Sequence, residues 1–236
     1  SGATITPDGR YVAFISNADL NTGSALHHGR SAYIWDRQTQ TVRGLGVDSL
    51  GARRWVDSVE LSADGGHAML YSGDRLTSDD QGTGQFPYEA YWCATDDPQG
   101  TMRLVSRGLA TGRDGNQLSY PISLSDDGRY VLFYSLATDL VPGNDTNNEY
   151  DVFLWDSQDR SITRVSDGPG VVTGDRTGNG YHALSHDGRY VAYSFERPPG
   201  VQPFLWREGD EDLDEHVSRL EWLLLDLLQP DQVATR

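Results

Sequence analysis

Lysine is absent from the 236-residue sequence, and cysteine occurs only once, at Cys93. All 19 basic residues are therefore arginines, and 35 aspartates and glutamates outweigh them, which gives a formal net charge of −16. This charge repels nucleic acids and anionic membrane surfaces, so neither is an expected partner. A single cysteine cannot form a disulfide within the chain, and Cys93, in an apolar segment, is expected to be a small buried side chain.

Long apolar runs and the common catalytic motifs are missing as well. No segment is apolar over the length that a bilayer-spanning helix needs, so membrane insertion is not expected. The sequence has no Gly-x-Ser-x-Gly, no phosphate-binding Gly-Lys-Ser/Thr and no Cys-x-x-Cys, which removes the commonest hydrolase, nucleotide-binding and zinc signatures. His182 and His186 are four residues apart, but they flank a predicted strand-to-turn junction, where this spacing does not place them on one face.

What the chain does contain is a phrase that returns four times, at intervals of about 60 residues. In each copy, Ser or Thr, a variable residue, Asp and Gly stand between a short apolar run and an alternating β-branched and aromatic run. Asp can bond its own backbone and Gly accepts a positive φ, so each copy predicts a β-hairpin. The four copies are Thr6–Phe14, Ser62–Leu70, Ser125–Phe133 and Ser185–Tyr193.

A third and a fourth strand are predicted to follow each hairpin in the first three repeats. The first repeat has an aromatic-rich run at 32–36 and a shorter run at 41–43. Four strands per repeat, without a convincing helix between them, are typical of a β-propeller blade, and a β-sandwich or a solenoid is the alternative. The sequence therefore predicts an all-β propeller with blades at about 1–45, 56–107, 119–167 and 179–209, followed by a tail at 210–236.

These blades resemble the TolB-like, WD-repeat-like propeller family, in which a Ser/Thr-Pro-Asp-Gly-Arg/Lys phrase precedes an Asp-Val-Phe-type third strand. Thr6–Phe14 and Asp151–Asp156 match that pattern closely, whereas Gly66–Leu70 departs from it. The resemblance implies a propeller fold and an extracytoplasmic, periplasmic or secreted, location in a bacterial protein. Family propellers often have six or more blades, so we expect either a four-bladed ring or part of a larger one, as a domain of a longer protein.

One loop of the third repeat is a candidate calcium site. Oxygen-bearing side chains alternate along it, which is the type of ligand that Ca²⁺ prefers, and family members have a similar loop. The alternative is an acidic, solvated turn whose side chains only cap backbone groups. Asp79, Asp80 and Glu89 in the second repeat are a weaker candidate. The predicted Ca²⁺ ligands are Asp145, Asn147, Glu149 and Asp151.

The tail has a different pattern. Leucine and valine recur at steps of four and three residues, as on one face of an amphipathic helix, and Pro230 would end that helix. A competing interpretation makes 216–219 the outer strand of the fourth blade, because it echoes 104–107. A helix face this apolar must be buried on the propeller, on another domain or on another subunit. The predicted partner-binding residues are Leu220, Trp222, Leu224 and Leu227.

Two functions fit these patterns. The first is a non-enzymatic recognition module that binds a protein or peptide with its variable loops. The second is a propeller enzyme, such as a glycosidase, a lactonase or the accessory domain of a peptidase, with its substrate at the mouth of the axis. Fold alone does not decide between them. Most aligned polar residues are repeat features: Arg10, Arg129 and Arg189, for example, recur after the turn glycine and are expected to pair with nearby aspartates. We therefore favour recognition.

Overall fold

Each repeat forms one antiparallel sheet whose strands are hydrogen-bonded in chain order. The computed structural model describes residues 3–20, 29–82, 88–143, 149–167, 182–197, 200–207 and 209. The four sheets are here called blades 1 to 4. Blade 1 comprises β1 (Ala3–Ile5), β2 (Tyr11–Ser16), β3 (Ser31–Asp36) and β4 (Thr41–Gly44), and blade 2 comprises β5 (Ser58–Leu61), β6 (His67–Ser72), β7 (Glu89–Ala94) and β8 (Arg103–Leu104). Blade 3 comprises β9 (Ser119–Leu124), β10 (Tyr130–Ser135), β11 (Asp151–Asp156) and β12 (Ile162–Arg164), and the described strands of blade 4 are β13 (Ala183–Leu184), β14 (Tyr190–Arg197) and β15 (Gly200–Arg207).

The repeated phrase forms the turn between the first two strands of every blade. In blade 3, the Ser125 hydroxyl donates to Asp127 Oδ1 at 2.7 Å, and the Tyr130 N–H donates back to Ser125 Oγ at 2.9 Å. Asp127 Oδ1 also accepts from the Arg129 N–H at 2.9 Å, and Gly128 takes a φ of +71°. The same three contacts recur in the other three turns. The predicted hairpins are therefore confirmed, together with the chemistry that specifies them.

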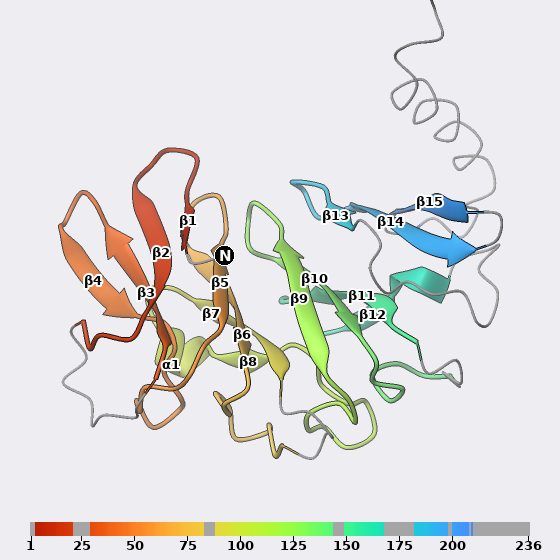
Figure 1. The fold of residues 1–236 in the computed structure, drawn as a ribbon, viewed down its shortest axis with the longest axis horizontal. Helices are drawn as coiled ribbons and strands as arrows, with labels where there is room; N and C mark the ends of the chain where they lie inside the picture. Colours follow the sequence, from red (N-terminus) through yellow and green to blue (C-terminus); the bar gives the residue numbers. More distant parts are fainter. Residues whose placement is uncertain are drawn as a thin grey trace, which may run out of the picture.

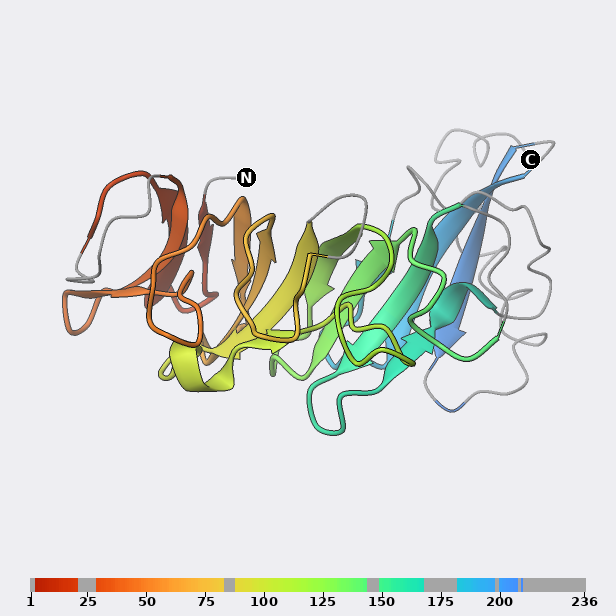
Figure 2. The same cartoon turned by 90° about the horizontal axis from the view of Figure 1, so that it is seen from below.

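The four blades lie side by side along an open arc, in chain order (Figure 1), and the view turned by 90° keeps that order (Figure 2). The cores lie between blades, because each buried cluster draws on two consecutive sheets. Ala13 and Ile34 of blade 1, for example, are buried in one cluster with Leu61 and Tyr91 of blade 2. Further clusters join blades 2 and 3 and blades 3 and 4. This is the stacking of β-propeller blades, as the sequence predicts.

A ring packed on a glycine links each blade to the next. Tyr11, at the start of β2, lies so close to the turn glycine of blade 2 that a Cβ on Gly65 would be 2.3 Å from the ring. His67 meets Gly128 in the same way, at 2.4 Å, and Tyr130 meets Gly188, at 2.1 Å. The turn glycine is therefore required twice, for its positive φ and for its missing side chain. We call this the ring-on-glycine contact.

In blades 1 and 3 the arginine after the turn glycine pairs with an aspartate at the end of the third strand, as predicted. The pairing also predicted for Arg189 of blade 4 is not found at the equivalent position. In blade 4 the residue opposite the start of β14 is Arg207 instead of an aspartate, and its guanidinium lies 5.7 Å from the ring centre of Tyr190. At this repeat position, ion pairs are found in two of the described blades, Arg10 with Asp36 at 3.0 Å and Arg129 with Asp156 at 2.6 Å.

Helix is confined to single turns in the described part of the chain. α1 (Pro98–Thr101) begins at Asp97, whose side chain accepts from the Gly100 N–H at 3.0 Å, and a 3₁₀ turn, η1, covers Val165–Asp167. No helix among the described residues is long and apolar enough to cross a membrane. Three strands of blade 4 are described; a fourth strand and the tail predicted at 210–236 lie outside the described residues.

Candidate functional site

The two ends of each blade carry different kinds of residue. The Asp-Gly turns lie at one end, which we call the turn end. The opposite end, the loop end, carries the connections from second to third strand and the entry into each first strand. At the loop end of blades 2 and 3, aromatic side chains converge on one another. This tyrosine cluster consists of Tyr71, Tyr88, Tyr120, Tyr134 and Tyr150.

The cluster crosses the boundary between the two blades. Tyr120, in the first strand of blade 3, has its ring centre 5.0 Å from that of Tyr71 in β6 and 5.0 Å from that of Tyr134 in β10. Tyr88 and Tyr150, each directly before a third strand, extend the cluster by further contacts of 5.2 and 5.0 Å. Tyr88 is 37% exposed and the other four are half-buried. The rings are therefore held rigidly by one another while part of each stays accessible.

The environment favours the protonated form of three of these phenols, Tyr71, Tyr134 and Tyr150. Burial raises the pKa of Tyr71, and the neighbouring phenol of Tyr120 raises it further. Burial and adjacent tyrosines likewise raise the pKa of Tyr134 and of Tyr150. Neutral phenols keep their O–H donors, so this surface offers apolar ring faces together with hydrogen-bond donors and acceptors.

The tyrosines are not part of the blade architecture. Tyr71 and Tyr134 occupy one repeat position, where blade 1 has Ile15 and blade 4 has Ser194. The turn contacts recur in all four blades, whereas among the described residues these aromatics are found in blades 2 and 3. The sequence analysis did not identify the cluster, although the recurrence of tyrosine in only two repeats was a visible signal.

The two histidines considered as a zinc pair lie at opposite ends of β13. The ring of His182 stacks on Tyr134 beside the tyrosine cluster, with 6.0 Å between ring centres. His186, at the turn end, has its Nδ1 2.9 Å from Asp126 Oδ2. Their spacing along the chain therefore does not bring them to one site.

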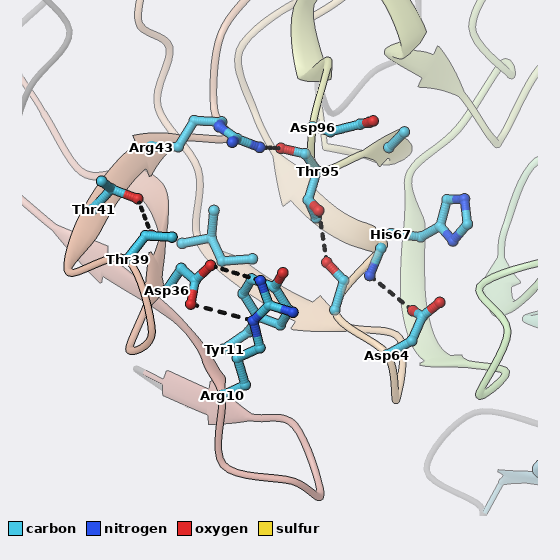
Figure 3. Close-up of a pocket in the computed structure, with 14 residues that line it drawn as sticks. Arg10, Tyr11, Asp36, Thr39, Thr41, Arg43, Asp64, His67, Thr95 and Asp96 are labelled. Carbon is cyan, nitrogen blue, oxygen red and sulfur yellow. Dashed lines mark hydrogen bonds and ion pairs between the residues drawn. The ribbon is translucent and has the colours of Figure 1, made fainter.

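A cleft of about 700 Å³ lies between blades 1 and 2 at the turn end (Figure 3). Ile34 lines it at the repeat position where blade 2 has Trp92, whose Nε1 donates to the Gly128 carbonyl at 2.7 Å in the next blade. Its charged lining includes Arg43, Asp64 and Asp96. It also includes the ion pair of the blade architecture, in which the Arg10 guanidinium lowers the pKa of the Asp36 carboxyl to about 2. Because Arg10 and Asp36 pair with each other and Asp64 bonds within its own turn, we assign no ligand to the cleft.

Carboxyl groups are also buried between blades 2 and 3. Glu89 is 1% exposed and Asp80 and Asp114 are each 3% exposed. Glu89 Oε2 accepts from the Ser106 hydroxyl at 2.5 Å, and Asp80 accepts from the Tyr91 hydroxyl. Burial raises the pKa of Glu89 to about 9 and also raises the pKa of Asp80. Among the residues that the structure describes, no group of acids, histidines or cysteines is arranged to hold a metal ion.

Glu89→Gln should flatten the dependence of stability on pH. The folded pKa of about 9 lies above the ordinary 4.5, so Glu89 contributes stability that is fully present below about pH 4.5 and is lost as pH rises toward 9. Glutamine keeps the shape and removes this titration. We expect equal melting temperatures near pH 5 and a higher one for the variant above about pH 8. Thermal melts followed by circular dichroism test this, and parallel curves for the two proteins would refute it.

Asp151, one of the predicted calcium ligands, is engaged within blade 3. It is 5% exposed, its Oδ1 accepts from the Ser166 hydroxyl at 2.6 Å, and its Oδ2 lies 3.7 Å from Arg164 Nη1. Blade 2 has the corresponding pair in Glu89 and Ser106. An acid that bonds a serine at this position is therefore a repeat feature, which gives Asp151 a structural role whether or not a cation binds nearby.

The structure describes only part of the other predicted sites. Glu149 is half-buried and directly precedes Tyr150. The calcium loop and the tail both remain predictions, because the remaining residues lie outside the described ranges: Asp145 and Asn147 of the loop, and Leu220, Trp222, Leu224 and Leu227 of the tail.

Comparison with known proteins supports the fold. No protein-family model and no curated protein matches the sequence. Among solved structures, TolB from Acinetobacter baumannii is 16% identical, with a TM-score of 0.45 over 88% of this chain and 40% of that one. A putative TolB from Agrobacterium tumefaciens is 18% identical, with a TM-score of 0.46 over 87% of this chain and 57% of that one. TolB proteins are thus among the structural neighbours, as the blade phrase implied.

A structure from a study of two prolyl endopeptidases is 11% identical, with a TM-score of 0.52 over 90% of this chain and 27% of that one. At such identities the likeness concerns the fold alone. The chain spans about half or less of the length of these neighbours, so their whole-protein activities are not transferred to it.

Proposed function

We propose that the chain is a non-enzymatic recognition module that binds a protein or peptide at the tyrosine cluster. The observation that carries this proposal is a half-exposed group of five tyrosines that the blade architecture does not require. Tyrosine provides a large, rigid contact area with a polar edge, loses little conformational entropy on binding, and is enriched at interfaces. A cluster that spans two blades suits an extended segment lying across their loop ends.

Charge narrows the chemistry of the partner. The net charge of −16 disfavours nucleic acids and anionic surfaces. At the loop end, burial raises the pKa of Tyr71 and the charge of Asp57 raises it further, and Asp74 follows β6. Asp57 Oδ1 lies 3.9 Å from Arg30 Nη1, and Asp74 Oδ2 accepts from the Trp55 N–H at 2.8 Å, so each carboxylate keeps one oxygen outside these contacts. Acids beside accessible tyrosine faces favour a segment that carries arginine or lysine, since a cation is attracted both to carboxylates and to aromatic rings.

The positions of the perturbed carboxyl groups support binding over catalysis. Enzymes gather strongly shifted groups where substrate can reach them. Here Glu89 and Asp80 are buried in hydrogen bonds within blade 2. Glu60, whose pKa burial raises to about 7, accepts a hydrogen bond from the backbone of Leu124 in the neighbouring blade. Two of the three groups thus bond within blade 2 and the third bonds to the next blade, so all three serve the blade architecture.

Peptide selection tests the proposal. Peptides chosen from a random displayed library against the intact chain are expected to be rich in basic residues. Tyr120→Ala should weaken their binding at least about tenfold, which corresponds to about 1.4 kcal/mol and is less than a typical hot spot contributes. Leu50→Ala is the control, because Leu50 is 87% exposed and lies in the β4–β5 connection. No enriched peptide, or equal binding by the Tyr120→Ala variant, would contradict the proposal.

Calcium would act in this module as a stabiliser of the loop next to Tyr150. If Asp145, Asn147, Glu149 and Asp151 hold Ca²⁺, the ion binds only the native state, so chelation should lower the melting temperature. Asp145→Ala should remove that difference. Differential scanning calorimetry with calcium and with a chelator measures it. A wild-type melting temperature that does not depend on calcium would leave the acidic turn as the explanation.

The proposal also includes the location of the protein and the role of its tail. The resemblance to TolB-like propellers implies a periplasmic or secreted location in a bacterial protein. The amphipathic tail would dock on another domain or subunit while the loop end stays free to bind. Removing residues 210–236 should then leave peptide binding unchanged, because the tyrosine cluster lies entirely within blades 2 and 3.

A further inference from the structure

The two end faces of the arc lack the contact that joins every pair of blades inside it. Tyr190 of blade 4 corresponds to the ring that packs on the next turn glycine, and it is 37% exposed, whereas Tyr130 at the same position of blade 3 is 4% exposed. Gly9, the turn glycine of blade 1, has a φ of +67°, and no described atom comes within 4 Å of the position of its Cβ. One end therefore presents the ring and the other presents the empty glycine.

On the face of blade 1 that points away from blade 2, apolar residues are also more exposed than their counterparts in other blades. Ile5, the last residue of β1, is 62% exposed, but its counterparts Leu61 and Leu124 are each 8% exposed because they pack on the preceding blade. Val12 and Phe14 in β2 are only half-buried, although the corresponding residues of blade 3 are fully buried. The face of blade 1 that points away from blade 2 thus has the residues of an internal interface, and no described blade covers it.

The face of blade 4 that points away from blade 3 likewise has residues that are buried at the same positions of other blades. Ala192 is exposed, whereas Ala13 and Leu132, at the same position of blades 1 and 3, are each 0% exposed. Leu205, which pairs with Ala192 across the sheet, is half-buried. Its counterpart Ile34 in blade 1 is 4% exposed. This face has the ring, the small residue and the leucine that a following blade would cover.

Backbone hydrogen bonds run in one direction along the arc. The second residue of each turn donates to the carbonyl of the same residue in the next blade: Ala63 N–H to Asp126 at 2.9 Å, and Asp126 N–H to His186 at 2.9 Å. Blade 1 has Pro7 at this position, which has no N–H but has a carbonyl that accepts. The His186 N–H of one end and the Pro7 carbonyl of the other are therefore a matching donor and acceptor.

We propose that two copies of this chain associate head to tail, with blade 4 of each packed on blade 1 of the other. Tyr190 of one copy would occupy the space over Gly9 of its partner, and Ile5 would be covered. A head-to-tail interface closes when the rotation completes a ring, and two four-bladed arcs give eight blades, within the usual range for propellers. The interface repeats the contacts that already join blades 1 to 4, so it needs no new chemistry.

Sedimentation equilibrium of the full chain tests the proposal. We expect twice the mass of one chain, and we expect Ile5→Asp and Tyr190→Asp each to weaken association at least about tenfold, because each buries a charge in the interface. Leu50→Asp, on an 87% exposed residue, is the control and should associate like the wild type. Circular dichroism confirms that each variant is folded.

Mixing the two variants separates head-to-tail pairing from a dimer in which the same face of each copy meets. Ile5→Asp leaves the blade 4 face intact and Tyr190→Asp leaves the blade 1 face intact, so their mixture should form a pair through one good interface although neither associates alone. In a dimer formed by two blade 1 faces or by two blade 4 faces, one variant keeps its interface and associates alone, and mixing does not rescue the other. A monomeric wild type would overturn the proposal, and so would a wild type that associates only after residues 210–236 are removed. A mixture of the two variants that does not associate would overturn it as well.

Discussion

Gly65→Ala is expected to destabilise the protein by about 2–5 kcal/mol, whereas Gly9→Ala should cost only about 1–2 kcal/mol. Both glycines have a positive φ, +72° and +67°, so an alanine is strained at either position. Only at Gly65 does the new Cβ also collide with a ring, because it would lie 2.3 Å from Tyr11. The difference between the two variants thus isolates the ring-on-glycine contact from the conformational cost.

Urea unfolding, at a protein concentration low enough to keep the chains apart, measures both values. Introducing Gly65→Ala into a Tyr11→Ala background should bring its cost down to that of Gly9→Ala, since the colliding ring is gone. Equal losses for Gly65→Ala and Gly9→Ala in the wild-type background would show that the close approach of Tyr11 does not matter for stability.

Arg53→Met should cost about 2–4 kcal/mol, because Arg53 is a buried cation whose donors are used by several segments. Its guanidinium is 5% exposed and donates to the Tyr33 hydroxyl at 2.8 Å, the Gly29 carbonyl at 2.8 Å and the Ala18 carbonyl at 3.2 Å. These contacts tie the β2–β3 loop of blade 1 to the connection that leads into blade 2. Methionine fills similar space but leaves the buried carbonyls without a donor.

Arg37→Met is the matched control for Arg53→Met, since Arg37 is exposed in the turn after β3. Thermal and urea unfolding should show a change within about 0.5 kcal/mol for the control. Proteolysis of the native protein adds a local readout: the Arg53→Met variant should be cut faster in the β2–β3 loop. Similar stabilities for the two variants would mean that Arg53 does not fasten that loop.

The blade architecture could be predicted from the sequence because its signals are local. The Ser/Thr, Asp and Gly of each turn satisfy one another within six residues, as Ser125, Asp127 and Tyr130 show, and the same phrase marks the same turn four times. Recurrence also predicted that Arg10 pairs with an aspartate, which the structure identifies as Asp36, 26 positions away. Repetition converts distant contacts into a pattern that can be read along the chain.

The candidate site depends on contacts between blades, and these leave no such pattern. Tyr71 and Tyr120 are far apart in the sequence and meet only because blades 2 and 3 stack with their loop ends together. The exposed Ile5 looks like its buried counterpart Leu61 in sequence, because only the absence of a preceding blade distinguishes them. Asp151 looks like a metal ligand in sequence because the serine that uses its carboxylate lies 15 residues further along.

The most direct test of the recognition surface is NMR of the chain with isotope-labelled tyrosines, titrated with a peptide selected from the library. The described tyrosines include the cluster at the loop end and others, such as Tyr11, at the turn end, so their signals report on different regions. The ring signals of Tyr88 and Tyr120 should shift in proportion to bound peptide, while those of Tyr11, at the turn end, stay unchanged. Shifts confined to Tyr11 or to other tyrosines outside the cluster would contradict the assignment of the loop end as the binding surface.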